Sequence, residues 1–200
     1  MVMVESIQEL KRELRKCMRV LRAAVPPGER MEAGRRIIEI ILSGQPPIPA
    51  PGRGSVMTMY VSDGGEPDFI PCLPELTRAG IVCCFPAFRR DQMEFYEAAQ
   101  ASDFAVGAYG LYEPEPTTPP IPGRKIDIML LPGMAFDRSG ARLGRGKSHY
   151  DRFLTQIDPG RRPLAVATCH DFQVLDHVPT DAADVKMDCL VTPSGVLTFM

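Results

Sequence analysis

Three basic residues and two glycines occupy five of the six positions 142–147 of this 200-residue chain. Glycine lets backbone N–H groups come close to an anion, and arginine and lysine add positive charge where a phosphate would sit. Residues 148–154 continue as an amphipathic segment, whose first turn would direct further N–H groups at the same anion. The spacing therefore predicts a phosphate-binding loop. Its cations are Arg142, Arg145 and Lys147, and its glycines are Gly144 and Gly146.

The loop matches neither of two common glycine motifs for nucleotides. A Walker loop ending at Ser148 would need glycine where this chain has Ala141, and the dinucleotide motif would need glycine at His149. On spacing alone, a solvated basic turn remains an alternative.

An apolar run at 126–131, closed by Pro132-Gly133, leads into this loop. Such a run is typical of a strand buried on both faces in a parallel sheet. Further strands are predicted over 55–61, 81–85, 93–97, 164–168, 188–192 and 195–200, and helices over 5–24, 29–42 and 67–79. This alternation predicts a single three-layer α/β/α domain over 1–200, with a central mixed, mostly parallel sheet.

The connections carry most of the prolines. Residues 26–28 are expected to end the first helix, and 45–54 to form a loop. The proline-rich stretch 107–124 is long for a structureless loop, and loops of that length are often functional.

Composition narrows the function classes. A net charge of −2 indicates no overall attraction to nucleic acid or to a membrane, so any anion site must be local. The six cysteines show no CxxC spacing, which favours reduced core thiols over zinc ligands. The N-terminal residues do not resemble a secretory signal, and no apolar run could span a bilayer. We therefore expect a cytoplasmic protein.

Three further groups of residues are candidates for a site. Cations recur on one face of the first helix, at Lys11, Arg15, Arg19 and Arg22, although a charged helix face is usually solvated. Glu66 follows a strand end and a glycine turn, where ligands often bind in α/β sheets, but it could also be a helix cap. Asp151 and Asp184 could be ordinary helix or loop caps. His170 and His177 are expected at the surface or as caps.

Residues 132–151 resemble the signature of the 5-formyltetrahydrofolate cyclo-ligases, also called methenyltetrahydrofolate synthetases. That pattern is PG-x-AFD-x-x-G-x-RLG-(R/Y)-G-(G/K)-G-(Y/F)-YD. Two positions depart from it: Ser148 replaces a glycine and His149 replaces an aromatic residue. The matching residues are Pro132-Gly133, Ala135-Phe136-Asp137, Gly140, Arg142-Leu143-Gly144-Arg145-Gly146-Lys147 and Tyr150-Asp151.

The resemblance implies an ATP- and Mg²⁺-dependent conversion of 5-formyltetrahydrofolate to 5,10-methenyltetrahydrofolate, with release of ADP and phosphate. By analogy with the family, Arg145 and Lys147 would stabilise the transferring phosphoryl group, and Asp151 and Asp184 would hold Mg²⁺. Residues implied to bind ATP are Lys11, Arg15, Arg142, Gly144, Arg145, Gly146, Lys147, Ser148, His149 and Tyr150. Those implied to bind the folate are Val61, Glu66, Arg145 and His149.

The two departures leave other interpretations open. One is a paralogue that binds nucleotide or folate without turnover, and another is a kinase-like enzyme that acts on a different small molecule. Under every interpretation we expect small-molecule partners only, with no nucleic acid and no membrane, and a monomer.

Overall fold

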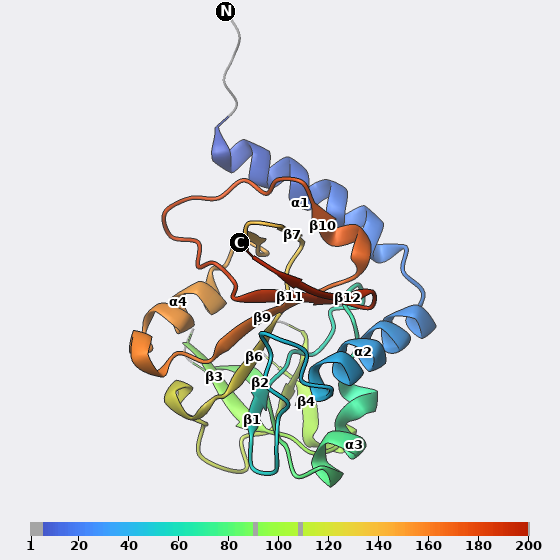
Figure 1. Ribbon diagram of the computed structural model, residues 1–200, viewed down its shortest axis with the longest axis vertical. Helices are drawn as coiled ribbons and strands as arrows, with labels where there is room; N and C mark the ends of the chain where they lie inside the picture. The colour runs from blue at the N-terminus through green and yellow to red at the C-terminus, as the bar shows by residue number, and fades with distance from the viewer. Residues whose placement is uncertain (1–5, 90–91, 108–109, 200) are drawn as a thin grey trace, which may run out of the picture.

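The computed structural model describes residues 6–89, 92–107 and 110–199. A seven-stranded sheet lies at its centre, in the order β12-β11-β9-β6-β1-β2-β3 (Figure 1). The inner strands from β11 to β2 are parallel, and the hairpins β2–β3 and β11–β12 add an antiparallel strand at each edge. The strands are β1 (Val56–Thr58), β2 (Val82–Arg89), β3 (Gln92–Glu97), β6 (Ile128–Leu131), β9 (Leu164–Thr168), β11 (Cys189–Thr192) and β12 (Gly195–Thr198).

Alternation along β6 separates the two halves of the core. Ile128 and Leu130 join a cluster with residues of α2 (Pro27–Leu42) and α3 (Leu73–Arg78). Met129 and Leu131 face the opposite way and join a cluster that contains Leu154 of α4 (His149–Thr155). Because successive side chains of a strand point to opposite faces, an all-apolar strand requires cover on both sides. The predicted layering and mostly parallel sheet are confirmed.

Two small sheets were not predicted. One contains β7 (Ala135–Asp137), β8 (Arg142–Leu143) and β10 (Val174–Leu175), so part of the signature forms a short hairpin next to the main sheet. The other pairs β4 (Phe104–Val106) with β5 (Tyr112–Pro114). The proline-rich stretch 107–124, long for a structureless loop, thus contains a strand at 112–114, while residues 108–109 lie outside the described part.

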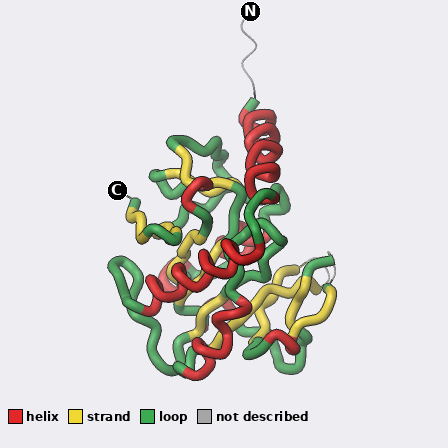
Figure 2. Tube along the Cα trace, turned by 90° about the vertical axis from the view of Figure 1, so that its right-hand side faces the viewer, coloured by secondary structure: helices red, strands yellow, loops and turns green. Residues whose placement is uncertain are grey.

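Helix α1 (Ile7–Ala23) lies at one end of the molecule (Figures 1 and 2). Its buried face is mixed: it buries Lys11, Met18 and Arg22, while the apolar side chains of Leu10 and Leu21 are exposed. The interpretation of the basic face as a solvated surface is thus wrong for Lys11 and Arg22, whereas Arg15 is half-buried and Arg19 is exposed. Lys11 and Arg22 pair with carboxylates of neighbouring loops, and Met18 packs into an apolar cluster with Ala135 of β7 and Leu143 of β8.

Several predicted boundaries shift. The strand predicted over 55–61 is regular only at 56–58, and 67–79 forms a 3₁₀ turn (Ile70–Cys72) followed by α3. Pro27 begins α2 rather than ending α1, because the first helical position needs no N–H donor. Glu5 and Met200, in predicted elements, lie outside the described residues. None of the helices in the described ranges is long and apolar enough to cross a membrane.

The cysteines are mostly core residues, as predicted. All six are free thiols and five are buried, whereas Cys17 on α1 is exposed. Burial raises the pKa of Cys72 to about 11 and those of Cys83 and Cys84 to about 12, so these thiols stay protonated and unreactive near neutral pH.

Candidate active site

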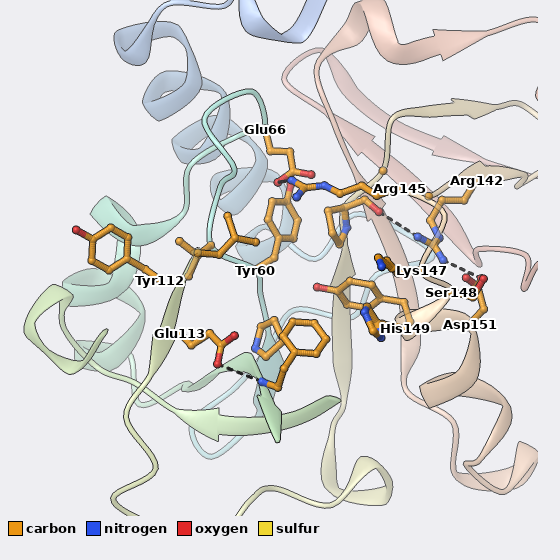
Figure 3. Close-up of a pocket in the computed structure, with 18 residues that line it drawn as sticks. Tyr60, Glu66, Tyr112, Glu113, Arg142, Arg145, Lys147, Ser148, His149 and Asp151 are labelled. Atoms are coloured by element: carbon orange, nitrogen blue, oxygen red, sulfur yellow. Dashed lines mark hydrogen bonds and ion pairs between the residues drawn. The ribbon is translucent and has the colours of Figure 1, made fainter. Parts of the chain in front are cut away.

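A cavity with a volume of about 380 Å³ opens at the carboxyl ends of the parallel strands (Figure 3). Residues 60–61 and 132–133 line it from the segments that follow β1 and β6, and Pro86 and Phe88 line it from β2. The segments 142–151 and 111–113 complete the wall. We refer to this as the first cavity. Its position agrees with the general location of ligand sites in open α/β sheets.

The second cavity, of about 330 Å³, lies between α1 and the turn 63–65. Three arginines of α1 line it, together with Met134 and Arg145. Arg145 also lines the first cavity, so its side chain forms part of both walls. The arginines of α1 in this wall are Arg15, Arg19 and Arg22.

A four-residue charge cluster separates the two cavities. Arg22 Nη2 lies 2.5 Å from Asp63 Oδ1 and 3.1 Å from Glu66 Oε1. Arg145 Nη2 lies 3.2 Å from Glu66 Oε2 and also pairs with Asp63. Figure 3 shows the Glu66 carboxylate next to the Arg145 guanidinium. Two cations and two carboxylates therefore neutralise one another within a few ångströms.

Burial sets the electrostatics of this cluster. Glu66 is only 3 % exposed, and burial raises its pKa above the usual value, against the opposing effect of Arg145. For Asp63, burial also favours the neutral acid, but Arg22 and Arg145 outweigh it and the pKa is lowered. Burial alone would lower the pKa of Arg145, and Glu66 with Asp63 reverses the direction. Glu66 is thus the member whose charge depends most on its neighbours.

The predicted phosphate-binding loop, residues 142–147, packs against α1. Arg15 Nε donates to the Gly144 carbonyl at 2.8 Å. Gly146 has φ +94°, a conformation that side chains rarely adopt, and a Cβ there would lie 3.6 Å from the Arg15 guanidinium carbon. Lys147 is exposed, and among the described residues it makes no ion pair or hydrogen bond. The loop thus presents one uncommitted cation beside the first cavity.

The two departures from the signature lie at the start of α4. Ser148 has φ 51° and ψ 26°, and it is the one non-glycine residue with positive φ among the described residues. The His149 ring is 4.6 Å from the Phe88 ring, and its Nδ1 is 2.9 Å from Arg152 Nη2. Position 148 therefore requires the left-handed conformation that glycine adopts freely.

Restoring glycine at position 148 should stabilise the protein. A left-handed conformation costs an L-residue roughly 1–2 kcal/mol, and glycine avoids this cost. Part of the gain is offset because glycine makes the unfolded chain more flexible. We expect Ser148→Gly to raise the free energy of unfolding by about 0.5–1 kcal/mol in urea titrations, with only a modest change in activity. Ser43→Gly is the control, because Ser43 has φ −69° and glycine should lower stability there. Equal effects of both substitutions would contradict the strain at Ser148.

The aspartates predicted as metal ligands are both paired with cations. Asp151 Oδ1 lies 2.8 Å from Arg142 Nη2 and accepts from the Val185 N–H at 3.3 Å. Asp184 Oδ2 lies 2.5 Å from Lys11 Nζ. The Val185 contact brings the segment that carries Asp184 next to Asp151. No group of three or more histidine, cysteine, aspartate or glutamate side chains in the described ranges could hold a metal by itself.

Two neighbouring carboxylates fit Mg²⁺ when phosphate oxygens and water supply its remaining ligands. Lys11 itself is buried between Asp184 and Asp181, whose Oδ2 lies 2.8 Å from Lys11 Nζ. Lys11 lines neither cavity. In this geometry the lysine orients the 181–184 segment.

Comparison with known proteins decides the family. The family model of the 5-formyltetrahydrofolate cyclo-ligases matches residues 7–193. The chain belongs to this family. A 5-formyltetrahydrofolate cyclo-ligase of Mycolicibacterium smegmatis is 35 % identical over 148 residues, which cover 70 % of this chain and 74 % of the relative. The cyclo-ligase of Escherichia coli K12 is 27 % identical over 90 % of this chain and 98 % of its own length.

A solved structure supports the same family assignment. The 5,10-methenyltetrahydrofolate synthetase of Aquifex aeolicus superposes with a TM-score of 0.78 at 31 % identity, and the match covers 94 % of this chain and 92 % of that chain. The resemblance inferred from residues 132–151 is therefore confirmed, as is the enzyme class.

The structure brings most of the predicted site residues of this cyclo-ligase together. Arg15 lines the second cavity, whereas Lys11, Gly146 and Asp184 line neither. Arg22, Asp63, Phe88, Tyr112 and Glu113 contribute to the cavities without having been predicted. The predicted residues that line the first cavity are Val61, Glu66, Arg142, Gly144, Arg145, Lys147, Ser148, His149, Tyr150 and Asp151.

Proposed function

We propose that this cyclo-ligase uses ATP, bound with Mg²⁺, to close 5-formyltetrahydrofolate to 5,10-methenyltetrahydrofolate. The family assignment supports the overall conversion. The observation that carries the two-substrate proposal is the position of Arg145, which lines both the first cavity and the arginine-lined second cavity. One cation can thereby contact the two substrates where they react.

The first cavity suits the folate. Aromatic rings of Tyr60, Phe88 and Tyr150 line it, and such rings can stack on a flat pteridine. Glu66 provides a carboxylate in the same wall. The amino and amide N–H groups at the edge of a pteridine are adjacent donors, and a charged acceptor forms stronger hydrogen bonds with them than a neutral one.

The second cavity and the adjoining loop suit the phosphates of ATP. Arg15 and Arg19 give this cavity a positive wall, and guanidinium groups bind phosphate oxygens in pairs. Arg15 also holds the backbone at Gly144, so the same side chain supports the loop that carries Arg145 and Lys147.

In the reaction that we propose, the formyl oxygen attacks the γ-phosphorus, a new O–P bond forms and the bond to the β-phosphate oxygen breaks, releasing ADP. N10 of the folate then attacks the activated formyl carbon, its proton is lost and phosphate leaves with the formyl oxygen. Arg145 and Lys147 would offset the charge that spreads over the transferring phosphoryl group. No covalent bond to the protein is needed.

Asp151 and Asp184 would hold Mg²⁺, which supplies charge neutralisation to the ATP phosphates when it is bound. We expect Asp151→Asn and Asp184→Asn each to weaken Mg²⁺-dependent ATP binding by about tenfold or more, because each removes a charged oxygen ligand. Calorimetry with ATP, with and without Mg²⁺, measures the effect.

Asp181→Asn is the matched control for Asp184→Asn. Asp181 shares the ion pair with Lys11 but is not a proposed ligand. If the Asp181 and Asp184 variants lose the same affinity with and without Mg²⁺, the two aspartates act only through Lys11 and the metal assignment is wrong.

The decisive test of the proposed function is an absorbance assay for methenyltetrahydrofolate with purified protein, 5-formyltetrahydrofolate, ATP and Mg²⁺. Product that forms only when ATP is present supports it. Folate and ATP binding without turnover would favour a non-catalytic paralogue, and ATP binding alone would favour a kinase-like enzyme. The cytoplasmic location and the monomeric state remain predictions.

A further inference from the structure

Arg22 is an arginine in the last turn of α1 whose side chain is only 3 % exposed. Besides its ion pairs with Asp63 and Glu66, its Nε donates to the Gly65 carbonyl at 3.3 Å. One guanidinium therefore contacts three of the four residues in the turn 63–66. A buried cation needs this many partners, since its desolvation is costly.

The contacts place Arg22 on the opposite side of Glu66 from the proposed folate. Glu66 lines the first cavity, whereas Arg22 lines only the second. Glu66 Oε1, 3.1 Å from Arg22, makes no hydrogen bond in the described part of the protein. That oxygen is itself buried against Arg22, so the ion pair supports the carboxylate from behind, and the Glu66 side chain that lines the first cavity keeps hydrogen-bonding capacity for a ligand N–H.

We propose that Arg22 is a positioning residue, which holds the Glu66 carboxylate in place and in its charged form for the N–H donors of the folate pteridine without touching the folate itself. The inference rests on the proposed function of the first cavity. It adds a role for α1 in folate binding, beyond the nucleotide contacts expected of that helix.

Charged and titratable groups face Glu66 from several elements. Asp63 belongs to its own turn, Arg145 comes from the loop after β8, and Tyr60 and Tyr150 from the segment after β1 and from α4. Burial raises the pKa of Glu66, and Asp63 adds to this, while Arg145 and Arg22 oppose it. Removal of Arg22 would raise the pKa of Glu66 further. In a titration from high to low pH, the variant without Arg22 would therefore lose folate affinity at a higher pH than the native protein.

A double-mutant cycle tests the inference, with dissociation constants for 5-formyltetrahydrofolate measured across the pH range. We expect Arg22→Gln to weaken binding about tenfold near neutral pH, and Arg22→Lys to weaken it less because the charge remains. In the Glu66→Gln background, Arg22→Gln should have almost no further effect. Arg12→Gln is the control, because Arg12 is exposed on the same helix and, among the described residues, forms its one ion pair with Glu13. It should leave binding unchanged.

A second readout needs no ligand. In ¹³C-carboxyl NMR of glutamate-labelled protein, the Glu66 signal is identified as the one that is missing from Glu66→Gln. In Arg22→Gln, the titration of this signal should move to higher pH. In Arg22→Lys, the titration should return largely to its position in the native protein. An unmoved titration overturns the inference even if folate binds. If the Glu66 titration shifts but the protein binds no folate, the effect of Arg22 on Glu66 is supported and the proposed function is wrong. Equal effects of Arg22→Gln with and without Glu66 would mean that Arg22 serves only the fold.

Discussion

Replacement of Lys147 by methionine should lower kcat by about 100- to 1000-fold, which corresponds to roughly 2.7–4 kcal/mol of lost charge stabilisation in the transition state. Lys147 lines the first cavity from an exposed loop position, and it makes no ion pair among the described residues. Its ammonium can therefore move to the phosphoryl group without breaking an existing contact. Methionine keeps the length of the side chain and removes the charge.

The measurement is the initial rate of methenyltetrahydrofolate formation over a range of ATP concentrations. Lys125→Met is the matched control, since Lys125 is exposed and lines neither cavity. A rise in the KM for ATP with unchanged kcat would show that Lys147 binds the nucleotide equally in the ground and transition states. In that case the catalytic role would fall to Arg145 alone.

The contrast between Lys147 and Arg145 was not apparent from the sequence, in which both are cations of one loop. Arg145 is 41 % exposed but already paired with Asp63 and Glu66. These carboxylates lie about 80 positions earlier in the chain. Local spacing predicts that a loop is basic, but it does not show which cation is committed to an ion pair, because that depends on the topology of the sheet.

Helix α1 is a second case in which the sequence predicted a local element but not its tertiary contacts. Its 3.6-residue periodicity predicted the helix to within two residues at each end, because local backbone geometry decides that pattern. The face that packs could not be predicted. Its cations contact Asp63, Gly144 and Asp184, which come from three separate loops, and its Met18 packs against β7 and β8. The same separation explains why Arg22 and Asp63 were missed, although Arg22 stood in the basic periodicity and Asp63 in the glycine turn.

The strands were predictable where they are buried on both faces. β6 and β9 consist of apolar runs, and both were located within two residues. β5 and β8 are two or three residues long and contain or follow proline, glycine or charged residues. Such strands exist because a neighbouring strand supplies hydrogen bonds, and sequence periodicity over two or three residues carries almost no signal.

Replacement of Glu66 by glutamine should chiefly impair folate binding. Glutamine keeps the shape of the side chain but removes the charge, and hydrogen bonds to a charged acceptor contribute about 1.5–3 kcal/mol. We therefore expect the dissociation constant for 5-formyltetrahydrofolate to rise by roughly 10- to 150-fold, with ATP binding unchanged. Calorimetry with each substrate measures both. Glu97→Gln, at the exposed end of β3, is the control.

The pH dependence gives this substitution a second, independent signature. Burial raises the pKa of Glu66, so the carboxylate takes up a proton at a higher pH than an exposed glutamate as the pH falls. Because the proton occupies the oxygen that would accept from the folate, affinity in the native protein should decrease with falling pH. In Glu66→Gln that decrease should disappear. An unaltered folate dissociation constant, or the same pH dependence in both proteins, would show that Glu66 serves only the charge cluster with Arg22 and Arg145.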